Sequence, residues 1–107
     1  MTQLKPLRFA TTSFESVRYH TSDDELPVRV VIERSAIDDY FEFQSATSDQ
    51  RKRAMDENLA AIESIVKSKY AQRGWTEGQD NISGRYRQIR INLTDLRQVS
   101  LKLPPEN

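Results

Sequence analysis

Alternating polar and apolar residues in the first third of the chain predict two β-strands. In segment 16–20, Val17 and Tyr19 fall on one side. Segment 28–33 is rich in β-branched residues and has the same period of two. The polar segment 21–27 between them is typical of a loop, so the two strands should form a hairpin. A shorter strand over 7–9 is an optional addition.

Two helices should follow these strands. Ser35 has the position of a helix N-cap, and Asp38 resembles its capping-box partner, which predicts a short helix to about residue 43. A long helix is predicted over 48–73, because Thr47 and Gln50 fit a capping box and Gly74 fits the left-handed position after a helix.

One apolar stripe runs along the long helix, with spacings of three and four residues that match the helical period. A helix of about 26 residues is roughly 39 Å long, which is long for so small a domain. We therefore expect part of it to project beyond the sheet or to pack against a second copy of the chain. The stripe consists of Met55, Leu59, Ile62, Val66 and Tyr70.

The C-terminal third predicts one clear strand. Segment 75–84 is rich in Gly, Asn, Asp and Ser and is expected to be a loop, and segment 84–93 alternates until Thr94 and Asp95 end it. Val99, Leu101 and Leu103 alternate again and predict an additional edge strand. Residues 104–107 should form a frayed polar tail.

The order of predicted elements is β-β-α-α-β, with extra edge strands as an option. This order favours an α+β fold, a two-layer sandwich in which a small antiparallel or mixed sheet carries both helices on one face. The predicted core side of the sheet holds Val17, Tyr19, Val28, Val30, Ile32, Ile89, Ile91 and Leu93. The opposite side holds Arg18, His20, Arg29, Val31, Glu33, Tyr86, Gln88, Arg90 and Asn92.

This layout resembles the DUF1488 family, small bacterial proteins that are catalogued as a domain of unknown function. The resemblance rests on segments 16–19, 30–41, 62–63 and 89–96, and it covers roughly residues 7–96. It implies a small α+β fold and a bacterial origin. It implies no catalytic residues for this chain.

Composition narrows the class of protein further. The chain has 107 residues, which suits one domain over 1–107, and its 16 basic side chains balance 16 acidic ones. That balance argues against a dedicated nucleic-acid-binding protein, which usually carries a basic excess. The absence of cysteine excludes disulfides, thiolate catalysis and Cys-ligated metal sites. With no apolar run of membrane-spanning length and no signal-peptide pattern, a cytoplasmic protein is expected.

Two basic concentrations are the candidate binding surfaces. Arg51, Lys52 and Arg53 lie in the first turns of the long helix, where cations oppose the helix dipole, so local stability does not explain them. The alternative is a solvated helix end with i,i+4 ion pairs. The second concentration lies on the last strand and its neighbours and suits either stacking and charge contacts to nucleic acid or a solubilised face. It consists of Arg85, Tyr86, Arg87 and Arg90, with Arg18 and Arg29.

Other chemistry-bearing residues favour structural interpretations. His20 is the single histidine and lacks the spacing of a metal site or a triad. The acidic run 23–25 predicts a solvated loop more than a cation site. The pair Asp38 and Asp39 is weak as acid–base machinery, and Trp75 is expected to cap the core more than to stack on a ligand. We therefore predict no catalytic, cofactor-binding or metal-binding residues.

The leading hypothesis is a small non-enzymatic binding or regulatory module that acts through protein–protein contacts, with a homodimer as one form. The alternative is a nucleic-acid-binding protein that uses the basic clusters at 51–53 and 85–90.

Overall fold

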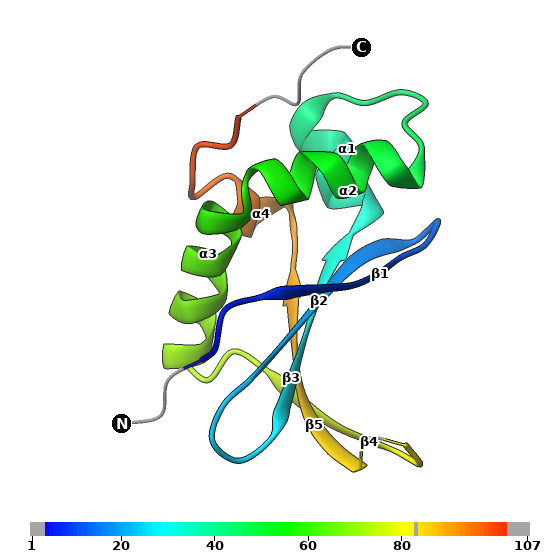
Figure 1. Ribbon diagram of the computed structural model, residues 1–107. Helices are drawn as coiled ribbons and strands as arrows, with labels where there is room; N and C mark the ends of the chain where they lie inside the picture. The colour runs from blue at the N-terminus through cyan, green and yellow to red at the C-terminus, as the bar shows by residue number, and fades with distance from the viewer. Residues whose placement is uncertain (1–3, 83, 103–107) are drawn as a thin grey trace.

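The chain folds into a mixed five-stranded sheet with helices packed on one side (Figure 1). The structure is a computed structural model, and it describes residues 4–82 and 84–102. Within these residues the strand order is β1-β2-β3-β5-β4, and the β3–β5 pair alone is parallel. This confirms the predicted α+β two-layer class. The elements are β1 (Arg8–Thr12), β2 (Ser16–Ser22), β3 (Pro27–Glu33), α1 (Arg34–Phe41), α2 (Ser48–Glu57), α3 (Leu59–Ala71), β4 (Thr76–Asp80), β5 (Gly84–Ile91) and α4 (Leu93–Leu96).

The core lies between the sheet and the helices, on the side that strand alternation predicts. The strand residues assigned to that side are at most 1% exposed, with one exception. Leu93 begins α4 and is only partly buried, because β5 ends at Ile91 and the Asn92–Asp95 capping box starts a helix there. The confirmed core positions are Val17, Tyr19, Val28, Val30, Ile32, Ile89 and Ile91.

The predicted long helix is wrong as one element, because the chain breaks it at Asn58. The Asn58 side chain donates to the carbonyls of Ala54 and Lys102 and accepts from the Lys102 N–H, so its amide fixes the C-terminal segment against the helix junction. Helix α3 then runs in a different direction from α2 (Figure 1). The predicted capping box of Thr47 and Gln50 is present at the start of α2.

The break also changes the role of the apolar stripe. Met55 before it and Ile62 and Val66 after it are all buried in the core, because the change of direction wraps both helices over the sheet. The argument that a projecting helix would pack against a second copy therefore no longer holds. A homodimer stays a prediction without that basis.

Three local predictions need correction. Ser35 lies inside α1, whose N-cap is Glu33 with no side-chain hydrogen bond. The predicted loop after Trp75 contains strand β4, which pairs along β5. Residues 99–102 form no strand; Val99 and Leu101 pack instead against the core. Leu103 and the predicted tail lie outside the described residues.

Candidate functional site

In the first predicted basic surface, segment 51–53, the side chain of Arg51 is buried. Arg51 has a side chain only 7% exposed, and its Nε and Nη2 donate to the two carboxylate oxygens of Asp38 at 2.8 and 3.1 Å. Such a two-point pair fixes both groups. The prediction that Arg51 belongs to a partner surface is therefore wrong; it ties α2 to α1.

The remaining cations of that turn lie among carboxylates. Lys52 pairs with Asp56 one turn later and lies 4.3 Å above the ring of Phe9. Lys52 and Arg53 line a shallow surface depression together with Asp49, Asp56 and Glu57. Two cations beside three carboxylates do not form a site that concentrates phosphate. A solvated helix end beside carboxylates is therefore the better description of Lys52 and Arg53.

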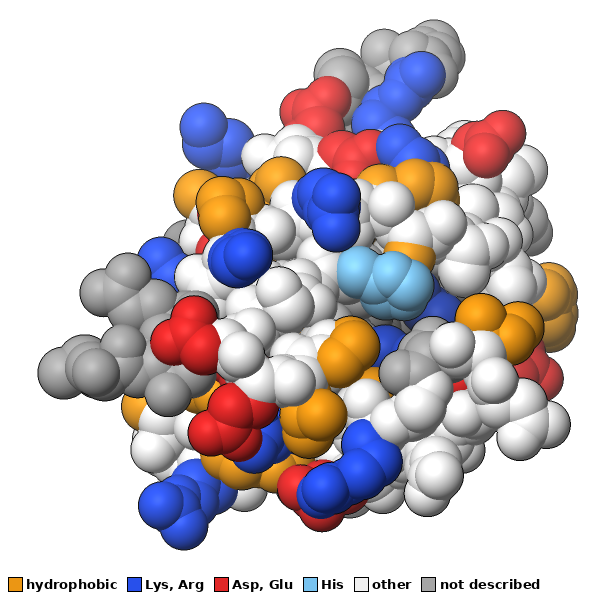
Figure 2. All heavy atoms as spheres, turned by 60° about the horizontal axis from the view of Figure 1, so that its bottom comes forward, with side chains coloured by type: hydrophobic (Ala, Val, Ile, Leu, Met, Phe, Trp, Pro, Cys, Tyr) orange, Lys and Arg blue, Asp and Glu red, His pale blue; other side chains and the backbone are white. Residues whose placement is uncertain are grey.

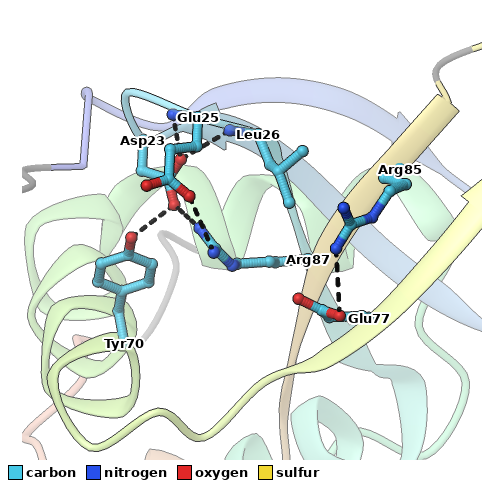
Figure 3. Close-up of polar contacts among 7 residues, drawn as sticks. All are labelled: Asp23, Glu25, Leu26, Tyr70, Glu77, Arg85 and Arg87. Carbon is cyan, nitrogen blue, oxygen red and sulfur yellow. Dashed lines mark hydrogen bonds and ion pairs between the residues drawn. The ribbon is translucent and has the colours of Figure 1, made fainter.

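The second predicted surface is divided by a buried acid. The Asp23 side chain is fully buried, and Figure 3 shows Arg87 of β5 and Tyr70 of α3 converging on its carboxylate. Its other oxygen accepts the backbone N–H groups of Glu25 and Leu26, each at 2.7 Å. The predicted hairpin loop over 23–25 is present, with Asp24 and Glu25 exposed, but the expectation that it is solvated is wrong for the side chain of Asp23. Arg87 lies on the helix side of the sheet. Through Asp23, strand β5 is connected to α3 and to the loop between β2 and β3.

The charge state of Asp23 follows from these contacts. Burial alone would raise its pKa, but the hydrogen bonds from Tyr70 and from two backbone N–H groups, and the charge of Arg87, lower the pKa below its ordinary value. Trp75 stacks on Tyr70 and lies under the Arg87 guanidinium, 4.9 Å from each by ring centroid. Trp75 is therefore part of this structural cluster.

Two further arginines of the second surface make exposed ion pairs. Arg85 faces the same side as Arg87 and approaches Glu77 at 3.6 Å (Figure 3). Arg90 lies on the opposite side of the sheet and bonds Glu33 at 3.0 Å. Since the predicted 85–90 cluster points to both sides of the sheet, it is not one surface.

The remaining candidate for a binding surface is the side of the sheet opposite the helices, which we call the open face. Strand register places Arg8, His20, Arg29 and Gln88 in one row across β1, β2, β3 and β5. The next row holds Thr11, Arg18, Val31 and Arg90. Figure 2 shows the chain's one histidine at the molecular surface with basic side chains near it. The open face thus carries four arginines against two carboxylates, Glu33 and Asp80.

Positive potential at the open face affects His20 directly. Partial burial and then the charges of Arg29, Arg8 and Arg18 lower the pKa of His20 below its ordinary value of 6.5. The neutral form of the imidazole therefore predominates at pH 7. Arg8 of β1 belongs to this group of arginines, although the sequence did not single it out, because its position beside His20 depends on the β1–β2 register.

Tyr86, the aromatic residue predicted for this surface, packs against residues of its own chain. Tyr86 faces Gly78 across the β4–β5 pair, and its ring lies where a side chain at Gly78 would be. The Arg29 guanidinium lies over the same ring, 3.8 Å from the centroid, and reaches Asp80. A glycine covered by a cross-strand aromatic ring is a known way to stabilise a strand. This contact explains why β4 forms without an apolar pattern.

Within residues 4–82 and 84–102 no group of three or more His, Asp or Glu side chains could hold a metal ion. None of the helices described is both long and apolar enough to cross a membrane.

The two residues of the predicted carboxylate pair differ in their surroundings. Asp38 accepts the hydrogen bonds of Arg51, while Asp39 is exposed.

Comparison with protein-family models, curated proteins and solved structures finds no match. The resemblance to the DUF1488 family therefore stays a prediction.

Proposed function

We propose that this chain is a small non-enzymatic binding module, acting in the cytoplasm, that holds a protein partner against its open face. One observation carries the proposal: the helices cover one side of the sheet, and the other side has four arginines for two carboxylates in a chain whose net charge is zero. Such local imbalance favours a partner of opposite charge. Among the residues assigned to a partner surface from the sequence, Arg18, Arg29, Tyr86 and Arg90 lie on this face.

The open face suits a protein better than nucleic acid. Single-stranded nucleic acid is held by aromatic rings that stack on bases as well as by cations. The ring of Tyr86 is instead engaged by Gly78 and Arg29. The two basic clusters of the nucleic-acid hypothesis are largely neutralised by acids from their own chain, as Arg51 and Arg87 illustrate.

The open face is also poorly suited to a second copy of itself. In a two-fold dimer the same patch meets itself, so an excess of arginines would face an equal excess. Like charges placed together across an interface disfavour association. A partner with a different, acidic surface avoids this repulsion.

The test is capture from nuclease-treated extract of the native cell. Wild type is compared with Arg8→Glu/Arg18→Glu on the open face and with Lys67→Glu/Arg97→Glu, which has the same net charge but changes exposed residues of the helical layer. We expect one defined protein to be retained by wild type and by the control and lost by the open-face variant. Equal capture by all three chains, or capture that occurs only from extract without nuclease treatment, contradicts the proposal.

A further inference from the structure

Two arginines of the open face differ from its other cations in their pairing. Arg29 bonds Asp80 and Arg90 bonds Glu33, which neutralises and orients both guanidinium groups. In the part of the chain that the structure describes, Arg8 and Arg18 form no ion pair, and Arg18 donates only to the hydroxyl of Ser16 at 3.1 Å. Both side chains are exposed. Their charges are the ones left for a ligand.

These two arginines and Arg29 surround a single histidine. Arg8 is the register partner of His20 on β1, Arg29 is its partner on β3, and Arg18 precedes it by two residues on the same side of β2. Neighbouring strands are about 4.8 Å apart and two residues along a strand span about 7 Å. The four residues therefore lie within one small area, and partial burial together with the charges of the three arginines lowers the pKa of His20.

We propose that the Arg8–Arg18–His20–Arg29 cluster binds an acidic protein segment in extended conformation, whose alternate carboxylates pair with Arg8 and Arg18. The inference rests on the proposed function and specifies the chemistry of its partner. An extended segment presents every second side chain to one side at about 7 Å, which is close to the separation of about 7–8 Å expected for diagonal neighbours on adjacent strands such as Arg8 on β1 and Arg18 on β2. Guanidinium groups pair with carboxylates through two parallel hydrogen bonds, and neutral His20 can add a third donor.

The structure supplies a direct readout for this site. His20 is the only histidine of the chain, so its ring protons give one unambiguous titration by NMR. Carboxylates placed beside it would offset the three arginines and raise its pKa. The probe is a synthetic peptide of alternating glutamate and threonine, with the glutamine–threonine peptide as its neutral counterpart.

We expect the glutamate peptide to bind at low salt and to raise the pKa of His20, and the glutamine peptide to do neither. Replacing one exposed arginine should weaken binding about two- to fivefold, so Arg8→Gln/Arg18→Gln should weaken it about tenfold. The matched control Lys67→Gln/Arg97→Gln should bind as wild type does. Binding should also weaken as salt is added.

Several results would overturn the inference. These are unchanged affinity in Arg8→Gln/Arg18→Gln, a His20 titration that the bound peptide leaves unmoved, or tighter binding of inorganic phosphate or of oligothymidylate than of the peptide. If the peptide fails while the capture experiment still finds a protein lost by the open-face variant, the acidic chemistry is wrong and the proposed function stands. If that capture also fails, both fall.

Discussion

Replacing Asp23 with asparagine should destabilise the protein strongly without changing its shape. The side chain is fully buried and accepts four hydrogen bonds, from Tyr70, Arg87 and the backbone N–H groups of Glu25 and Leu26. Asparagine keeps one oxygen for the backbone donors. Its amide nitrogen would face the Arg87 guanidinium, which can only donate, and the charge that balances Arg87 is lost.

The magnitude follows from the burial of both partners. Removing one partner of a buried ion pair costs about 3–5 kcal/mol. Here Arg87 keeps 15% of its side chain exposed and a longer contact to Glu25 at 3.5 Å, which recovers part of the loss. We therefore expect Asp23→Asn to lower the free energy of unfolding by about 2–3 kcal/mol, or the melting temperature by roughly 10–20 °C.

Urea unfolding followed by circular dichroism measures this loss, and Asp24→Asn is the matched control. Asp24 is the exposed neighbour, so its replacement should change the free energy of unfolding by no more than about 0.5 kcal/mol. A double-mutant cycle with Arg87→Met should give a coupling of about 1 kcal/mol or more. If Asp23→Asn and Asp24→Asn unfold alike, or the cycle shows no coupling, the account of this network is wrong.

The same network predicts a dependence on pH. Because the pKa of Asp23 lies below its ordinary value of 3.8, its folded state holds the proton less tightly than the unfolded state does. The stability that it contributes is therefore fully present above pH 3.8 and is lost as the pH falls through the lower folded-state pKa. Asp23→Asn lacks this contribution, so the gap between wild type and variant should narrow in acid.

Three further substitutions test other parts of the structure. Arg51→Met should lower the free energy of unfolding by about 2–3 kcal/mol in urea, because it removes the buried partner of Asp38, whose side chain is 23% exposed and is partly solvated without it. Arg53→Met at an exposed position should change it by less than about 0.5 kcal/mol. Gly78→Val should displace the Tyr86 ring and cost about 1–3 kcal/mol, and unaltered tyrosine signals in near-ultraviolet circular dichroism would contradict this packing. His20→Gln should be slightly less acid-sensitive than wild type below pH 6.5, because the depressed pKa of His20 makes protonation destabilise the folded state.

The sequence predicted correctly those features that depend on neighbouring residues, such as the alternation of strand residues and a capping box. The period of two placed Val30 and Ile89 on the core side correctly, and the Thr47 capping box marked the start of α2. The break at Asn58 could not be seen this way, because the apolar spacing continues across it and the partner that fixes its amide, Lys102, lies 44 residues later. Strand β4 was missed for a similar reason, since its stabilising contact is the ring of Tyr86 on another strand.

The candidate site shows the same division between local and long-range information. Alternation correctly placed Arg18 and Arg29 on the side away from the helices, but a count of cations along the chain could not tell which of them would be neutralised. Arg87 finds Asp23 at a separation of 64 residues, and Arg51 finds Asp38 across a helix–helix contact. Ion pairs within the chain thus neutralise Arg51 and Arg87, one arginine from each basic cluster of the sequence. Since the formal charge of the chain is zero, acids that pair with arginines in the helical layer leave an excess of arginines on the open face. There the described residues give Arg8 and Arg18 no ion pair, and the proposed acidic segment would balance their charge.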